Sequence, residues 1–219
     1  MIRTVLSVIA LAGLVLVTVA ACGTPPEVVV EPESTATPAP TAQPTPPDAG
    51  EVDPCSLLSD DDAEAVAGEP MTDRAVADVG GLPACQMSGD SRGIQVVQVP
   101  ANVWAKTLPA LIEQVQAAGG FGEENDARLE DAAARIEAGD YDGLDACEFF
   151  STLTELNGTP PGQSRTVAYV PDGLAPQAIS AQSCVNGTYT SLMLVGADIA
   201  VDADTETAIE AALDLLEKD

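Results

Sequence analysis

The chain has 219 residues, with 35 acidic side chains against 8 basic ones, no histidine and a formal net charge of −27 at pH 7. This charge argues against a nucleic-acid partner, because such binding depends on Lys and Arg side chains that meet phosphates. The absence of histidine excludes Ser-His-Asp and Cys-His catalytic arrangements and any imidazole metal ligand.

The first residues have the pattern of a lipoprotein signal peptide. A short segment with one positive side chain, Arg3, precedes an apolar run that ends in Val19-Ala20-Ala21-Cys22. Small residues before a cysteine are typical of a lipobox, so we expect removal of residues 1–21 and attachment of diacylglycerol to the Cys22 thiol. The acyl chains, palmitate among them, would hold the protein on the outer face of the plasma membrane. Plain secretion and a retained transmembrane helix are the alternatives, but a retained helix gives no reason for the Ala-Ala-Cys sequence.

The segment 22–52 has the composition of a tether. After Cys22 it contains eight prolines, five threonines and no aromatic residue, so it offers nothing to bury and is expected to be extended. Residues 53–219, about 165 residues, are enough for one domain with its own core.

Capping residues mark the helix starts at the beginning of this domain. Asp53 and Pro54 suit an N-cap and a first helical position, and Ser59 is expected to cap a helix that ends at Gly68. The apolar segment 94–99, which follows the second cysteine of the domain, predicts a strand.

A buried helix face is expected next. Pro109 must kink this helix or begin it, and the only tryptophan, Trp104, is interpreted as a core residue and not as a ligand platform. The apolar positions follow helical spacing: Trp104, Leu108, Leu111 and Val115. The charged segment 119–143 is expected to be helical around residues 127–138.

The second part of the domain contains the clearest local signals. Asp145 with Glu148 suggests a capping box for a helix that ends at Asn157-Gly158. Asn186-Gly187 between two β-rich segments predicts a hairpin, because a type I′ turn needs positive φ at both positions. The strands are expected at residues 165–170, 178–185 and 189–195. A final apolar stripe predicts a buried helix face: Ile209, Ala212, Leu213 and Leu216.

Four cysteines remain apart from Cys22, which predicts two disulfides with three alternative connectivities. Residues 53–59 are echoed by residues 145–151, with Asp, Cys, two bulky apolar residues and Ser at the same spacing. This echo suggests a diverged duplication with halves at about 53–120 and 145–219, although convergence on a helix-start motif is an alternative. The duplication favours two pairs, Cys55–Cys85 and Cys147–Cys184. The predicted fold is therefore α+β, with helices packed on an antiparallel sheet, two disulfides and two diverged halves.

Acidic segments are better explained by helix capping than by metal binding. The triplet 60–62 suits the positive end of a helix. Residues 202–206 imitate the start of a calcium loop, but Thr207 and Leu213 occupy the positions of its glycine and its bidentate glutamate. A second, weaker calcium candidate consists of Asp140, Asp142 and Asp145. We expect neither a metal site nor a cofactor.

One combination of these features resembles a known lipoprotein family. The sequence Asp53-Pro54-Cys55-Ser56-Leu57-Leu58-Ser59 follows a lipobox and a Pro-rich tether, and residues 180–191 extend the likeness toward the C-terminus. The chain resembles an actinobacterial-type lipoprotein family that is catalogued as a domain of unknown function. Met87 stands where that family often has tryptophan. The resemblance implies a compact α+β fold and attachment to the cell envelope, and it carries over no catalytic residue.

The expected function is that of a membrane-anchored, extracytoplasmic binding or accessory module of the cell envelope, not of an enzyme. Its negative surface is compatible with a basic envelope protein as partner. A carrier of an apolar ligand is the first alternative, and a deep pocket between sheet and helices would distinguish it. A hydrolase that uses paired carboxylates is the second, and it requires a cleft with two facing carboxylates.

Overall fold

The computed structural model describes residues 53–117, 121–171, 176–197 and 199–218. The predicted signal peptide, the lipidation site at Cys22 and the tether therefore lie outside the described residues. Within the described part, no helix is both long enough and apolar enough to cross a membrane.

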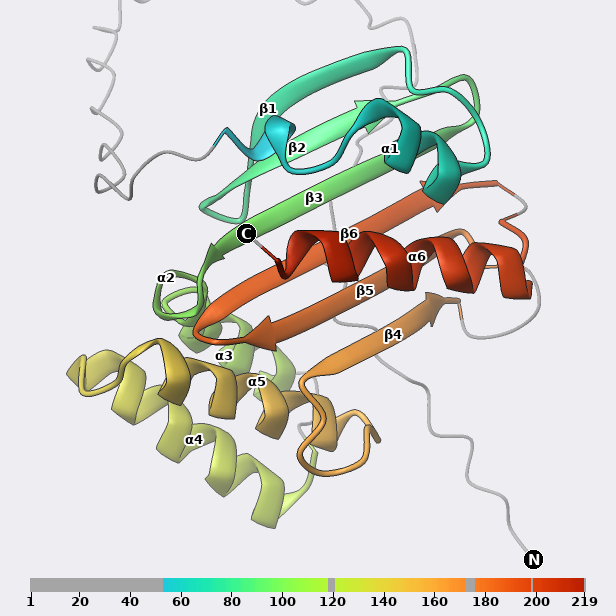
Figure 1. Cartoon of the computed structure of the whole chain (residues 1–219). Coiled ribbons are helices and arrows are strands. Elements are labelled where there is room, and N and C mark those ends of the chain that lie inside the picture. The colour runs from blue at the N-terminus through green and yellow to red at the C-terminus, as the bar shows by residue number, and fades with distance from the viewer. Residues whose placement is uncertain (1–52, 118–120, 172–175, 198, 219) are drawn as a thin grey trace, which may run out of the picture. The chain divides into compact units, whose positions relative to one another are not determined.

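A six-stranded antiparallel sheet forms the centre of the fold (Figure 1). Across the sheet the strands are β1 (Asp73–Val79), β2 (Leu82–Ser88), β3 (Arg92–Pro100), β6 (Thr188–Gly196), β5 (Ala178–Val185) and β4 (Arg165–Val170). The two halves of the domain meet where β3 pairs with β6, from Arg92 opposite Gly196 to Pro100 opposite Thr188. The edge strands are β1 and β4.

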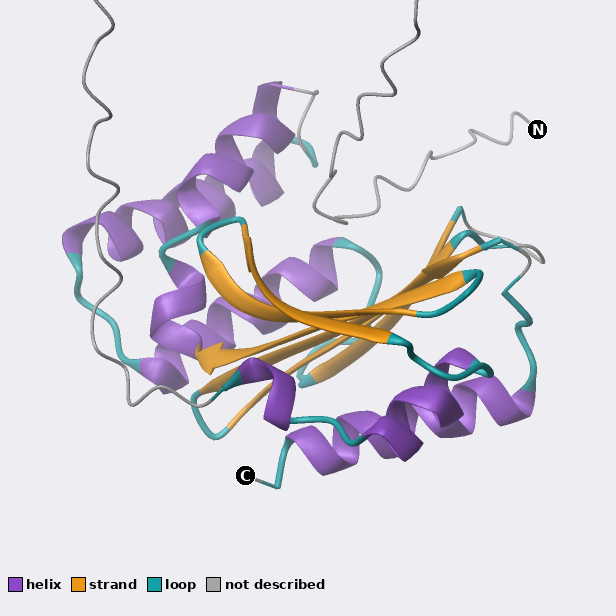
Figure 2. Ribbon diagram, turned by 90° about the horizontal axis from the view of Figure 1, so that it is seen from above, coloured by secondary structure: helices purple, strands orange, loops and turns teal. Residues whose placement is uncertain are grey.

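Helices lie on both faces of this sheet (Figure 2). One face, here called the α6 face, is covered by the 3-10 helix η1 (Pro54–Ser56), α1 (Asp60–Ala67) and α6 (Ala203–Leu216). The other, the α5 face, is covered by α2 (Ala101–Ala105), α3 (Leu108–Ala117) and α5 (Gly143–Leu156), with α4 (Glu123–Ala138) against α3 and α5. The α+β architecture predicted from the sequence is confirmed.

Each face has its own hydrophobic core, because successive side chains of a strand point to opposite sides of a sheet. Strand β3 supplies Ile94 and Val96 to the core under α6, and Val97 and Val99 to the core under α5. Both cores, both disulfides and all the described helices and strands lie within residues 53–218.

The first two helix starts form as predicted. The Asp53 carboxylate accepts the Cys55 amide, and the Ser59 hydroxyl accepts the Asp62 amide at the start of α1. Helix α1 ends at Gly68, whose φ of 72° is the left-handed conformation that glycine adopts readily.

The proline in the third helical segment begins a helix instead of kinking one. Pro109 is the second residue of α3, and α2 ends at Ala105, so the second of the two alternatives holds and Trp104 lies in a separate helix. The change of axis moves the apolar stripe: Trp104, Leu108 and Ile112 are buried, whereas the predicted Leu111 and Val115 are only half-buried. The expected helix around residues 127–138 is α4.

Helix α5 begins one turn earlier than predicted. Its capping box joins Asp142 to Asp145, not Asp145 to Glu148. The Asp142 carboxylate accepts the amides of Leu144 and Asp145, while the Asp145 carboxylate accepts the Asp142 amide. The first helical position is Gly143, whose Cα lies against the backbone of Gly187. A residue with a Cβ fits poorly there, because the Cβ would meet the Gly187 carbonyl oxygen at 3.1 Å.

Two hairpins of the sheet have two-residue turns, and the sequence analysis identified one of them. Asn186 and Gly187 have φ of 52° and 79°, the positive pair expected of the turn between β5 and β6. The hairpin of β1 and β2 was not predicted. Its signal was the pair Gly80-Gly81, which forms a two-residue turn with φ of 62° and 86°.

The two halves repeat in element order but not in three-dimensional arrangement. Each half has a helix, three antiparallel strands and a further helical segment, and each encloses one disulfide. A twofold rotation that exchanged the antiparallel strands β3 and β6 would leave equivalent helices on the same face. Helices α1 and α5 instead lie on opposite faces, so no such rotation relates the halves.

Candidate functional site: a pocket beside strand β4

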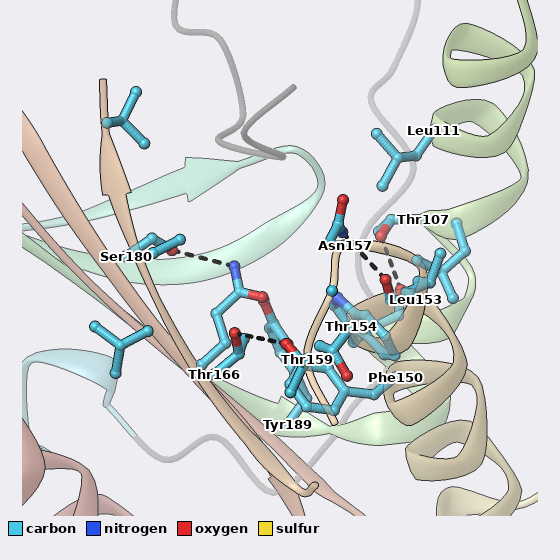
Figure 3. A pocket seen from close by; sticks show the side chains of 17 residues that line it. Thr107, Leu111, Phe150, Leu153, Thr154, Asn157, Thr159, Thr166, Ser180 and Tyr189 are labelled. Carbon is cyan, nitrogen blue, oxygen red and sulfur yellow. Dashed lines mark hydrogen bonds between the residues drawn. The ribbon is translucent and has the colours of Figure 1, made fainter. Parts of the chain in front are cut away.

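A pocket of about 400 Å³ lies on the α5 face, between the β4–β5 edge of the sheet and helices α2, α3 and α5. In Figure 3, Thr166 and Ser180 face it from the strands, while Leu111, Leu153 and Thr154 face it from the helices. The loop after α5, residues 157–159, contributes to the rim. A volume in this range is typical of sites for small molecules.

Three aromatic side chains form the base of the pocket: Trp104, Phe150 and Tyr189. The rings of Trp104 and Tyr189 are stacked with centroids 4.5 Å apart, and Phe150 meets both edge-on, at 5.9 and 6.1 Å. All three are at most 8% exposed. Trp104 is thus the core residue that the sequence predicted, and in addition its side chain borders the pocket.

Aliphatic side chains continue the wall from this base toward the opening. Leu108 is buried, and Leu111 and Leu153 are half-buried. The pocket therefore changes from a dry aromatic base to a wall that solvent reaches. This gradient suits a ligand whose apolar end enters first.

Hydroxyl and amide groups also line the pocket. The hydroxyls of Thr159 and Thr166 are 3.4 Å apart, and the Gln182 amide donates to the Ser180 hydroxyl at 3.3 Å. The Thr154 hydroxyl donates to the carbonyl of Ser151. These groups have hydrogen-bonding capacity to spare, since a hydroxyl accepts as well as donates and an amide carries two hydrogens and an oxygen.

No charged side chain is among the described residues that line the pocket. Tyr189 is the one titratable group there, and burial raises the pKa of its hydroxyl to about 12. It is therefore neutral throughout the physiological range. The pocket is an uncharged site in a protein of net charge −27.

The four cysteines form the two predicted pairs. Cys55 bonds to Cys85 across 30 positions on the α6 face, and Cys147 bonds to Cys184 across 37 positions on the α5 face. The second bridge joins α5 to β5, which are two walls of the pocket.

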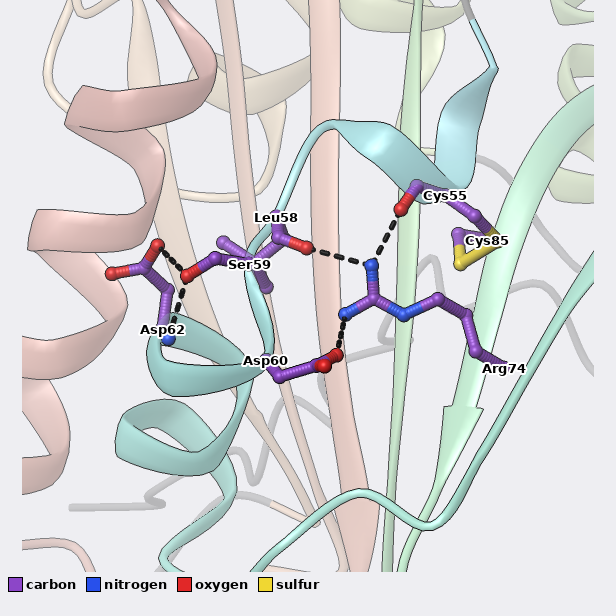
Figure 4. A network of polar contacts seen from close by, with 7 residues as sticks. All are labelled: Cys55, Leu58, Ser59, Asp60, Asp62, Arg74 and Cys85. Carbon is purple, nitrogen blue, oxygen red and sulfur yellow. Dashed lines mark hydrogen bonds and ion pairs between the residues drawn. A yellow bond between two sulfur atoms is a disulfide. The ribbon is translucent and has the colours of Figure 1, made fainter.

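The acidic triplet after Ser59 has structural roles. The Arg74 guanidinium donates to the carbonyls of Cys55 and Leu58 and forms an ion pair with Asp60 at 2.7 Å (Figure 4). The Asp62 carboxylate accepts a hydrogen bond from the Ser59 hydroxyl, and the Asp62 amide donates a hydrogen bond to the same hydroxyl. This network fixes the connection between η1 and α1 against strand β1.

The calcium candidates are helix starts as well. Asp142 and Asp145 are occupied by the capping box of α5, and Asp202 accepts the Thr205 amide at the start of α6. Among the described residues, no group of three or more Asp, Glu or Cys side chains is arranged to hold a metal ion. Cys22 lies outside the described residues.

The sequence analysis did not identify the pocket residues as a group. They come from α2, α3, α5, the loop after it and three strands, and their side chains are ordinary Leu, Thr, Ser and Gln. Trp104, Leu108 and Leu111 were named in advance as parts of one buried helix face, and helical spacing alone could not place them beside a cavity.

Comparisons with known proteins found no family model, no curated protein and no solved structure that matches this chain.

Proposed function

We propose that this protein is a lipid-anchored, extracytoplasmic binding module whose pocket on the α5 face takes a small, largely apolar ligand. The observation that carries the proposal is the pocket itself, about 400 Å³ with a buried aromatic base. A pocket between sheet and helices is the feature that distinguishes a ligand carrier from a module that acts only through its surface.

The expected location supports the same function. The lipobox at Cys22 and the Pro-rich tether hold the domain near a membrane, where apolar compounds are concentrated. The resemblance to envelope lipoproteins of unknown function agrees with this placement. The hydrolase alternative gains no support at this site, because no carboxylate is among the described lining residues.

A matched pair of substitutions tests whether the pocket binds. Ala168 and Ala75 are the two ends of one cross-strand row, on edge strands β4 and β1, and both are exposed on the α5 face. Only Ala168 lines the pocket. Ala168→Trp should therefore fill the opening, and Ala75→Trp should add the same apolar area elsewhere on the sheet.

The assay is titration of the mature chain, produced without its lipid, with a neutral solvatochromic dye such as Nile red. We expect saturable binding of one dye per chain in the wild type and in Ala75→Trp, and at least about tenfold weaker binding in Ala168→Trp. Equal binding by both variants would mean that the dye covers the open sheet and that the pocket is not a binding site.

A further inference from the structure

We infer that the ligand of this pocket is an uncharged amphiphile, with an aliphatic body at the aromatic base and a hydroxyl- or amide-bearing head at the polar wall. The inference rests on the proposed function and specifies the chemical class of the ligand. It excludes fatty acids, anionic phospholipids and alkylammonium compounds as preferred ligands.

The first step is the electrostatics of the lining. Burying an ionised group without a partner is costly, because neither a counter-charge nor bulk water replaces its hydration. The described lining residues contain no Lys or Arg for an anion and no Asp or Glu for a cation. A charged head group of either sign that entered the pocket would be unpaired.

The second step is the position of the polar groups. Ser180 and Thr154 are buried, Gln182, Thr159 and Thr166 are half-buried, and all five line the pocket. A purely apolar ligand would leave these groups without water and without new partners, which is unfavourable. A head group with hydroxyl or amide functions would satisfy them.

The third step is the surface that continues from the pocket. The cross-strand row through Ser180 runs on to Met193, Gln95 and Gln86, and these side chains share the α5 face. None of these side chains is charged. Helices α2, α3 and α5 cover only one end of this face (Figure 2). The neutral surface thus extends in the direction that a larger head group would take.

The overall charge and the lining lead to opposite expectations for cations, which makes the inference testable. The field of a protein of net charge −27 attracts cationic amphiphiles and repels anionic ones. If the overall field dominated the affinity, the cationic compound would bind most tightly, the neutral one less tightly and the anionic one least. If the lining dominates the affinity, the neutral compound binds most tightly and both charged compounds bind more weakly.

The experiment is titration of the mature, unlipidated chain with three compounds that share one alkyl length and differ in head group. They are lauroylglycerol, laurate and dodecyltrimethylammonium, each used below its critical micelle concentration. Trp104, the only tryptophan, lies in the base and reports occupancy through its emission. We expect lauroylglycerol to bind at least about tenfold more tightly than either charged compound.

A gain of cation binding provides the second readout. Gln182→Glu places a carboxylate in the polar wall, while Gln86→Glu makes the same change on the α5 face outside the pocket. We expect Gln182→Glu to bind dodecyltrimethylammonium at least about tenfold more tightly than the wild type, because the head group gains a partner. Gln86→Glu should leave the affinities unchanged.

The possible failures separate the inference from the proposed function. Tightest binding of the cationic compound, or equal binding of all three, would overturn the inference and leave a ligand pocket in place. An equal response of Gln182→Glu and Gln86→Glu would also overturn it, since the overall field would then explain both. Binding of none of the three compounds, nor of the neutral dye, would overturn the proposed function.

Discussion

Removal of the Cys147–Cys184 disulfide should weaken both the fold and the pocket, whereas removal of Cys55–Cys85 should weaken only the fold. The double substitutions Cys147→Ala with Cys184→Ala, and Cys55→Ala with Cys85→Ala, leave no free thiol from the broken pair. The bridges lie on opposite faces of the sheet. Each variant is therefore a control for the other.

The two losses of stability are expected to be nearly equal. The bridges join residues 37 and 30 positions apart. In the chain-entropy model these loops correspond to about 3.8 and about 3.6 kcal/mol at room temperature, a difference well below the error of the model. A small domain has about 5–15 kcal/mol in total, so both variants should remain mostly folded without denaturant.

The loss of ligand affinity should differ between the two variants, because only one of the disulfides joins elements that line the pocket. Cys147 is on α5, which carries Phe150, Leu153 and Thr154 of the pocket, and Cys184 is on β5, which carries Ser180 and Gln182. Without this bond the two walls can separate. Cys55 and Cys85 join η1 to β2, where the described lining has no member.

The assay combines urea unfolding followed by circular dichroism with dye titration in the absence of urea. We expect similar midpoints for the two variants, and at least about threefold weaker dye binding only in the variant without Cys147–Cys184. Equal dye affinity in both variants would refute the idea that this bridge positions the pocket walls. A much larger stability loss in one variant would refute the loop-entropy reasoning.

Three further outcomes are expected. Cys22→Ala should abolish metabolic labelling by a fatty-acid analogue and release the protein or leave its precursor unprocessed, so label on the variant would disprove the anchor. Burial raises the pKa of Tyr189 from 10.0 to about 12. The free energy of unfolding should therefore be unaffected by this group below pH 10 and should fall by about 2–3 kcal/mol by pH 12. Urea titrations at these pH values should show a smaller fall for Tyr189→Phe. Asp142→Ala should cost about 1 kcal/mol in urea unfolding by removing the α5 cap, whereas Asp140→Ala, two residues earlier, should cost much less.

Much of the fold could be predicted because local signals marked it. Ser59 and Gly68 delimit α1, and Asn186-Gly187 has the two positive φ values that an Asn-Gly pair between strands predicts. The start of α5 was misplaced because Asp142 and Asp145 are both competent caps, and contact of Gly143 with the Gly187 backbone selects the earlier one. That contact joins distant segments and leaves no trace in the local pattern.

The disulfide pairing was predicted correctly although the halves are not related by rotation. The shared feature is local: a cysteine in or near a helical start pairs with a cysteine in a strand that follows. The pocket had no such local marker. It exists because α5 ends at Leu156 and strand β4 lies at the open edge of the sheet, which leaves space that α3 does not fill.

The most direct test of the central claim is to identify what the protein carries in its own cell envelope. The lipidated wild type, Ala168→Trp and Ala75→Trp would be isolated under mild conditions, and native mass spectrometry with extraction of bound compounds would follow. We expect an uncharged amphiphile on the wild type and on Ala75→Trp, at one per chain, and its loss from Ala168→Trp. A wild-type protein without any bound compound, or an identical compound on Ala168→Trp, would contradict the claim that this pocket is the binding site.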